Sequence, residues 1–150
     1  AATPPAAVTA ASGGTGARPG AAATPTCDMN YVFETGELEI AALPTTSPWA
    51  EKYGCGPRVR RADIVDDKAG WVYDTSRQGD PNPAWGRQAR PGTAQVYVYP
   101  RCKGGKLVAD VMRLDKGHTE GLEPKVTEAL IRMVVAAPSG KLRAGAAGGD

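Results

Sequence analysis

The sequence predicts an α+β domain in which a small antiparallel sheet of hairpins carries one C-terminal helix packed on it. Three observations predict this class. Apolar and polar residues alternate in several short runs between residues 29 and 111, turns rich in glycine separate these runs, and helical spacing of apolar residues appears only after residue 121. Strands followed by a helix are typical of a sheet covered on one face.

The first two hairpins are expected in the N-terminal half of the domain. The runs MNYVFE and ELEIAAL, on either side of Thr35-Gly36, predict a hairpin over residues 29–43. A second hairpin is expected to pair RVRRADIV at 58–65 with WVYD at 71–74. Between them, three prolines make residues 44–57 a loop, in which Trp49 and Tyr53 have the spacing of a single helical turn.

The last unit is a strand, a turn, a strand and a helix. AQVYVYP at 94–100 and KLVADVMRL at 106–114 are the strands, and Gly104-Gly105 supplies backbone angles that other residues resist. Helical spacing then continues to the proline at 138, and a proline and two glutamates suit the first turn of that helix. The residues in helical spacing are Leu122, Val126, Leu130, Met133 and Val134.

Composition divides the chain into one small domain and two flexible ends. Residues 1–26 consist mainly of Ala, Pro, Gly and Thr, which bury too little apolar surface to offset the entropy of ordering the chain, and residues 143–150 have the same character. The expected domain is therefore 27–142. Its core is thin, because Leu, Ile, Val and Phe together are 23 of the 150 residues, and part of its stability is expected to come from a partner surface.

Charge and hydropathy exclude some classes and suggest a compartment. The chain has 18 basic and 16 acidic residues, a balance that argues against binding of nucleic acid, and no apolar run has the length of a membrane span. The N-terminal tail has no acidic residue before Asp28. It is similar to the end of an organelle transit peptide or to the linker after a bacterial signal peptide. The expected location is a plastid, a mitochondrion, the periplasm or the extracellular space.

Three cysteines allow one disulfide and a free thiol in an oxidising compartment. Cys27 precedes the first predicted strand and Cys102 follows a later one, so a bridge between Cys27 and Cys102 joins two ends of the sheet. Cys55, in a loop between two glycines, is an equally good partner, and three reduced thiols are the other alternative. No CxxC pair is present, so no metal site is expected.

The long loop at 75–93 is the main candidate for contact with a partner. It is rich in proline and glycine, and unstructured loops of this length usually have a function or lie against another surface. Trp85, in its middle, packs on the domain's own core or anchors a partner. The predicted partner-binding set combines this tryptophan with nearby aromatic and basic residues: Trp85, Trp49, Arg87, Arg90, Tyr97 and Tyr99. We therefore expect a non-enzymatic accessory or adaptor subunit of a larger protein assembly.

A catalytic alternative depends on His118, the single histidine of the chain. Histidine is suited to acid–base catalysis, and Asp115 or Glu120 is close enough in sequence to orient its ring. This alternative is a small secreted enzyme or toxin. A lone histidine among turn residues is more often simply solvated, and no phosphate-binding loop or cofactor motif accompanies it. No catalytic residue and no cofactor are therefore predicted.

Residues 94–142 also suggest a family. AQVYVYP, CKGGKLVADVMRL, LEPKVTEALIRM and APSGKL follow one another as strand, turn, strand and helix. This layout resembles the C-terminal domains of the TonB and TolA energy-transducing proteins, in which a Pro/Ala-rich segment upstream is also common. The resemblance implies a bacterial envelope domain that passes a signal or force between membranes.

Overall fold

The computed structural model describes residues 26–72, 76, 81–85 and 88–137. The predicted flexible ends, apart from Thr26, and Arg87 lie outside the described residues. In chain order the elements are β1 (Tyr31–Gly36), η1 (Glu37–Glu39), α1 (Pro48–Lys52), β2 (Val59–Arg60), β3 (Ile64–Asp66), η2 (Pro83–Trp85), β4 (Gly92–Val98), η3 (Lys103–Gly105), β5 (Val108–Arg113) and α2 (Pro124–Ala136).

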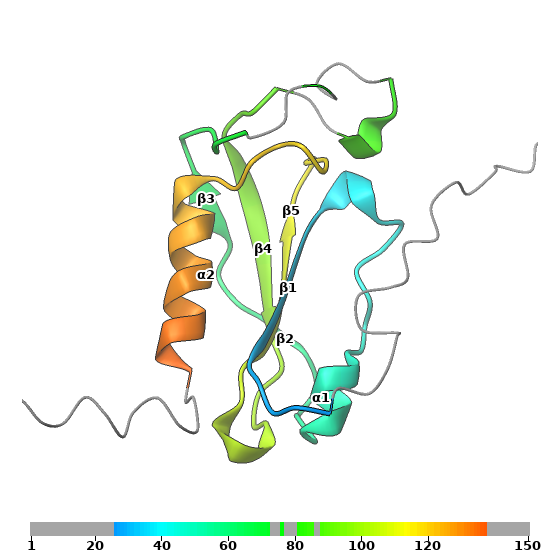
Figure 1. The fold of residues 1–150 in the computed structure, drawn as a ribbon, viewed down its shortest axis with the longest axis vertical. Coiled ribbons are helices and arrows are strands. Elements are labelled where there is room, and N and C mark those ends of the chain that lie inside the picture. The colour runs from blue at the N-terminus through cyan, green and yellow to red at the C-terminus, as the bar shows by residue number, and fades with distance from the viewer. Residues whose placement is uncertain (1–25, 73–75, 77–80, 86–87, 138–150) are drawn as a thin grey trace, which may run out of the picture.

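The α+β class is confirmed, but the sheet is mixed. Its strands have the order β1-β5-β4-β2, and β3 also pairs with β4. Strand β4 is antiparallel to β2, β3 and β5, whereas β1 runs parallel to β5. The helix α2 lies along one side of the sheet, and α1 lies near the end where β1 begins (Figure 1). The antiparallel prediction is therefore wrong for β1.

The predicted hairpin over residues 29–43 fails because β1 has a better partner far along the chain. After Gly36 the chain enters η1, where the Glu39 carboxylate accepts a hydrogen bond from the Gly36 amide at 2.8 Å. Leu38 N then donates to Lys116 O at 3.0 Å, which holds this turn against the segment after β5. A β-carbon on Gly36 would lie 2.3 Å from Lys116 O. Only glycine allows this close approach.

The second predicted hairpin is also wrong, whereas the third hairpin and the helix are confirmed. Segments β2 and β3 pair with different parts of the same edge of β4, and Trp71 and Val72 belong to no strand. Strands β4 and β5 pair from Ala94↔Arg113 to Val98↔Ala109, as the alternation predicts. The predicted turn at Trp49 is the helix α1.

Two small clusters of apolar side chains form the core, one on each face of the sheet. Under α2, the buried members are Ala94, Val96, Val111 and Val126. On the opposite face, α1 packs against the ends of β4 and β5, where the buried cluster contains Trp49, Ala50, Tyr53, Tyr99, Cys102 and Val108. Tyr31 stacks on Trp49 with ring centroids 5.3 Å apart. Each cluster is small, in agreement with the low content of large aliphatic residues.

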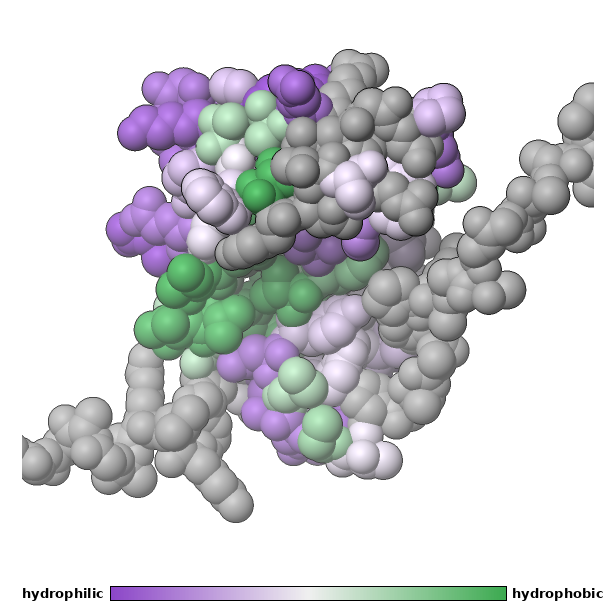
Figure 2. Space-filling view, turned by 45° about the horizontal axis from the view of Figure 1, so that its top comes forward, coloured by the Kyte–Doolittle hydropathy of each residue, from purple (hydrophilic) through white to green (hydrophobic). Residues whose placement is uncertain are grey.

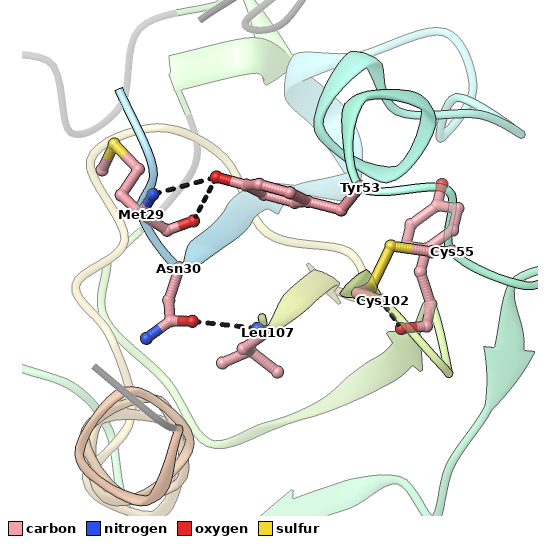
Figure 3. Close-up of a disulfide and its surroundings, with 7 residues drawn as sticks. Met29, Asn30, Tyr53, Cys55, Cys102 and Leu107 are labelled. Carbon is pink, nitrogen blue, oxygen red and sulfur yellow. Dashed lines mark hydrogen bonds between the residues drawn. A yellow bond between two sulfur atoms is a disulfide. The ribbon is translucent and has the colours of Figure 1, made fainter. Parts of the chain in front are cut away.

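The disulfide joins Cys55 to Cys102, so the predicted bridge between Cys27 and Cys102 is wrong (Figure 3). Backbone hydrogen bonds hold the end of α1 beside the β4–β5 turn: Gly56 N donates to Pro100 O at 2.6 Å and Lys103 N donates to Tyr53 O at 2.8 Å. These contacts bring the cysteine after α1 to Cys102, whereas Cys27 is exposed and free.

The start of β1 is held at the same end of the molecule by side-chain contacts. The Tyr53 hydroxyl accepts from Met29 N at 2.9 Å and donates to Met29 O at 3.0 Å (Figure 3). Asn30 Oδ1 accepts from Leu107 N at 2.9 Å, and Tyr31 N donates to Leu107 O at 2.8 Å. These bonds fix the parallel register of β1 on β5.

Candidate functional site

The structure separates the residues that the sequence grouped as a partner-binding surface. Trp49, on α1, and Tyr99 are both buried in the cluster between α1 and the sheet, and their predicted role in partner binding is not tested by these positions. Alternation along β4 explains the position of Tyr99, because the face of β4 opposite α2 becomes a covered face where α1 and the disulfide pack. Tyr97 is half-buried on that same face, with the Arg58 guanidinium 4.5 Å from its ring centroid.

Beside Tyr97 lies a buried polar group built around Asp110. Its Oδ2 accepts from the Tyr99 hydroxyl at 3.2 Å and lies 3.4 Å from Arg58 Nη1. Burial raises the pKa of Asp110, and the Tyr99 and Arg58 contacts oppose this rise only in part. Burial, together with the Asp110 carboxylate, raises the pKa of Tyr99 to about 12. These groups are mutually satisfied within the sheet and have a structural role.

The remaining predicted residues, Trp85 and Arg90, lie at the other end of the molecule, around the segment that connects β5 to α2. We call residues 114–123 the 114–123 loop. In Figure 1 this loop lies at the end of the sheet where β1 ends, together with η1 and η2. Two backbone bonds tie η2 to the loop: His118 N donates to Ala84 O at 2.8 Å and Thr119 N donates to Trp85 O at 2.9 Å.

A buried cluster of charged side chains holds the 114–123 loop on the end of the sheet. Lys116 and Glu123 are each 1% exposed, and Lys116 Nζ lies 2.9 Å from Glu123 Oε1. The ammonium group also donates to Arg90 O at 2.5 Å and to Pro91 O at 3.0 Å. Neither Glu123 oxygen has a hydrogen bond in the described structure, so this carboxylate depends on the charge of Lys116.

Arg113 and Arg90 extend this cluster on both sides of the loop. Arg113 Nε donates to Glu34 Oε1 at 2.6 Å, and its Nη1 donates to Glu120 O at 2.5 Å. Arg90 Nε donates to Glu120 Oε1 at 3.0 Å, and Arg90 Nη1 donates to Asp115 Oδ2 at 2.8 Å. The predicted role of Arg90 in partner binding is not tested by these contacts, but its guanidinium already has two acidic neighbours.

Trp71 is held by a close crossing of two backbone segments. A β-carbon on Gly121 would lie 1.4 Å from Trp71 O, and one on Gly70 would lie 2.0 Å from Gly121 O. Both positions therefore require glycine, and the crossing fixes the backbone of Trp71 against the 114–123 loop. Its indole nevertheless remains 74% exposed. An exposed side chain on a fixed backbone loses less conformational entropy in any contact than one on a mobile segment.

Trp85, at the end of η2, also contacts the 114–123 loop. Its carbonyl accepts both from Thr119 N and from Thr119 Oγ1, at 2.9 and 2.6 Å. Its ring meets His118 edge to face, with centroids 5.5 Å apart. Trp85 is therefore half-buried against its own domain. This position agrees both with packing on the domain and with contact to a partner, the two roles that the sequence left open.

Trp71 and Trp85 line one cleft of about 600 Å³. Charged as well as aromatic side chains line it, and the 114–123 loop supplies five of its eleven lining residues. The lining residues are Glu34, Trp71, Val72, Trp85, Arg113, His118, Thr119, Glu120, Gly121, Leu122 and Thr127. This volume lies within the range of small-molecule and side-chain pockets.

His118 stands at the rim of this cleft and pairs with a glutamate that the sequence analysis did not consider. Its Nδ1 lies 2.7 Å from Glu39 Oε2, and its side chain is 65% exposed. Asp115 and Glu120, the predicted orienting residues, instead contact Arg90. A carboxylate on Nδ1 fixes the orientation of the ring and leaves Nε2 as the atom available to solvent or a ligand.

Sequence reasoning missed Trp71, Glu34 and Glu39 because it assigned all three to strands of hairpins. Gly70 and Gly121 have no side chain, as a close crossing of two backbones requires, but nothing in the sequence indicates that these two glycines meet.

A second hollow of about 390 Å³ lies beside α1 and is lined by Ser47, Arg58 and Tyr99 among others. Within the described ranges, no group of acidic, histidine and cysteine side chains has a metal-binding arrangement.

No helix in the described part of the chain is long and apolar enough to cross a membrane. Comparison with known proteins adds no relative: no family model, no curated protein and no solved structure matches this chain. The resemblance to TonB and TolA domains therefore remains a likeness of layout over residues 94–142.

Proposed function

We propose that this chain is a non-catalytic accessory subunit that binds a partner protein through the cleft between Trp71 and Trp85. The observation that carries this proposal is the exposed Trp71 indole on a backbone fixed by Gly121. A tryptophan contributes a large contact area at a low cost in side-chain entropy, and tryptophans dominate the energetics of many interfaces. An indole that stays exposed to water contributes little to the folding stability of the domain, so its position is better explained by contact with a partner.

The disulfide between Cys55 and Cys102 supports a location outside the reducing cytosol, because such bonds persist in oxidising compartments. An organelle with an oxidising space, the bacterial periplasm or the extracellular space agrees with this proposal. Exposed apolar residues in the C-terminal half of α2 offer a second contact area, separate from the cleft lining. Hydrophobic side chains gather over the helix side of the molecule (Figure 2), where Ile131, Val134 and Val135 are exposed on α2.

The test compares three forms of the affinity-tagged chain expressed in its source cells. The proteins recovered with each form are quantified by mass spectrometry. We expect Trp71→Ala to lower the yield of a specific partner at least about tenfold, a typical loss for an interfacial tryptophan, without changing the yield of the tagged chain. Val59→Ala is the matched control, because Val59 is an exposed apolar residue on β2 that belongs neither to the cleft lining nor to the apolar area on α2. Equal recovery with all three forms would refute the proposal.

A second candidate function is acid–base catalysis at His118, favoured by the 2.7 Å contact between Nδ1 and Glu39 Oε2. A histidine oriented in this way at a cleft is a common arrangement for proton transfer. The candidate requires that a reaction found with the purified chain fall at least about a hundredfold in His118→Ala. If such a reaction survives that substitution, His118 is a structural contact of Trp85 and the catalytic candidate is excluded.

A further inference from the structure

We propose that the cleft recognises a cationic side chain, an arginine or lysine in an extended basic segment of the partner protein. This inference rests on the proposed function, since it names the chemistry of the group that the cleft accepts. Two features of the cleft support it: the two tryptophans that line it, Trp71 and Trp85, and a local surplus of carboxylates. Cations bind favourably over indole rings, and carboxylates add a direct ionic attraction.

The carboxylate surplus is local to this end of the molecule. Among the described residues, the charged cluster contains six carboxylates and three cationic side chains, so its formal charge is −3 with His118 neutral. Four of the carboxylates contact these cations, whereas Glu37 accepts from Asp115 N and Glu39 contacts His118 Nδ1. The whole chain, in contrast, has a net charge of +2. The carboxylates are Glu34, Glu37, Glu39, Asp115, Glu120 and Glu123, and the cations are Arg90, Arg113 and Lys116.

Glu34 is the carboxylate best placed to meet a ligand. It lines the cleft, and its side chain is 25% exposed, whereas Glu120, the other carboxylate of the lining, is 0% exposed. Arg113 Nε occupies Glu34 Oε1 at 2.6 Å and holds the group in position. Its second oxygen has no partner in the described structure, so it can accept from a guanidinium or ammonium group.

Several described basic residues of this chain lie together at the opposite end of the molecule. The β4–β5 turn contains Arg101, Lys103 and Lys106, and it lies at the far end of the sheet from the 114–123 loop (Figure 1). Attraction between the acidic cleft and a basic partner segment therefore also orients the chain on its partner. A second copy that inserts this turn is the competing occupant, and solution experiments distinguish the two.

The experiment titrates the purified chain with Nα-acetyl-arginine-N-methylamide and follows the indole N–H signals of its three tryptophans by NMR. The matched probe is the citrulline analogue, which has nearly the same shape and no charge. We expect saturable shifts for Trp71 and Trp85 with the arginine probe and much smaller shifts with the citrulline probe. Trp49, buried under α1, is the internal control and should not move.

Glu34→Gln should weaken the arginine probe about three- to tenfold, whereas Glu51→Gln, an exposed carboxylate on α1, should have no effect. Amide signal dispersion checks that Glu34→Gln remains folded, and Trp71→Ala, which removes an exposed side chain, gives an independent loss of binding. Equal shifts with both probes, shifts of all three indoles, or no shift at tens of millimolar arginine probe would overturn the inference. Dimerisation of the purified chain that Lys103→Gln abolishes would assign the cleft to a second copy and also overturn it.

The outcomes separate this inference from the proposed function. If Trp71→Ala loses the partner in cells but the arginine probe does not bind, the cleft binds a partner through other chemistry and the cationic inference fails alone. If the probe binds while Trp71→Ala retains every partner, the pocket stands and the subunit proposal fails.

Discussion

Replacing Lys116 by methionine tests whether the buried charged cluster holds the 114–123 loop, and with it the cleft. Methionine keeps most of the side-chain volume and removes the ammonium group. The change eliminates the hydrogen-bond donors to Arg90 O and Pro91 O. Glu123 is 1% exposed and its carboxylate has no hydrogen bond in the described structure, so its remaining ionic contact is with Arg113 Nη1 at 3.8 Å. Breaking one partner of a buried ion pair destabilises a protein by about 3–5 kcal/mol.

The expected loss is a large part of the stability of a domain of this size, whose total is about 5–15 kcal/mol. At about 4 °C per kcal/mol, Lys116→Met should lower Tm by roughly 12–20 °C. Thermal and urea unfolding followed by circular dichroism at neutral pH measure both quantities. Lys125→Met is the control: Lys125 is 55% exposed and its Nζ lies 3.7 Å from Asp67, which is 81% exposed, so its loss should cost less than about 1 kcal/mol.

A second substitution identifies the cause of the destabilisation. Glu123→Gln in the Lys116→Met background removes the uncompensated negative charge and should recover about 1–3 kcal/mol. A change of less than about 1 kcal/mol in the single Lys116→Met variant, or no recovery in the double variant, would refute the argument that this ion pair holds the loop.

Three further predictions test other parts of the structure. Gly121→Ala should destabilise the domain by about 1–3 kcal/mol or more, measured by urea unfolding, and should weaken every Trp71-dependent interaction, because its β-carbon overlaps the facing backbone; normal stability and binding would contradict the close crossing. Reduction of the Cys55–Cys102 bond, or serine at both positions, should lower the free energy of unfolding by about 2–4 kcal/mol, and an unchanged urea midpoint would argue against the bond. For Asp110, burial raises the pKa in the folded state, so the folded protein binds this proton more tightly than the unfolded chain. Relative to Asp110→Asn, wild type should therefore lose stability as the pH rises from about 4 through the raised pKa; a flat or opposite difference in urea unfolding between the two proteins would show that Arg58 and Tyr99 fully compensate the burial.

Local pattern was sufficient to predict the elements whose partners are neighbours in sequence. The β4–β5 hairpin and α2 follow directly from two-residue alternation, Gly104-Gly105 and helical spacing, and the structure confirms them. The strand at Tyr31 was also found, but its partner β5 lies more than seventy residues away in the parallel register Tyr31↔Val108. Alternation indicates that a strand exists and which residues share a face, and it does not indicate which strand will pair with it.

The candidate site was less predictable because it depends on contacts between distant segments. Trp85 was selected as a residue of interest from its loop and lines the cleft, whereas Trp71 was assigned to a strand that does not form. Tyr99 is buried because α1, with Trp49, and the disulfide cover the face of the sheet on which it lies, and no local pattern indicated this cover. The pairing of Cys55 with Cys102 likewise depends on the position of α1, which cysteine spacing cannot supply.

The native size of the chain in its source cells shows whether the chain is a subunit of a larger assembly. Gently lysed cells are separated by gel filtration, and the chain is detected in each fraction by mass spectrometry. We expect the chain to elute with a large complex, far above the 15.6 kDa of the chain alone. In cells that express Trp71→Ala, we expect the chain to shift to the elution position of the monomer. Elution of the wild-type chain as a monomer near 15.6 kDa would contradict the claim that it is a subunit of an assembly.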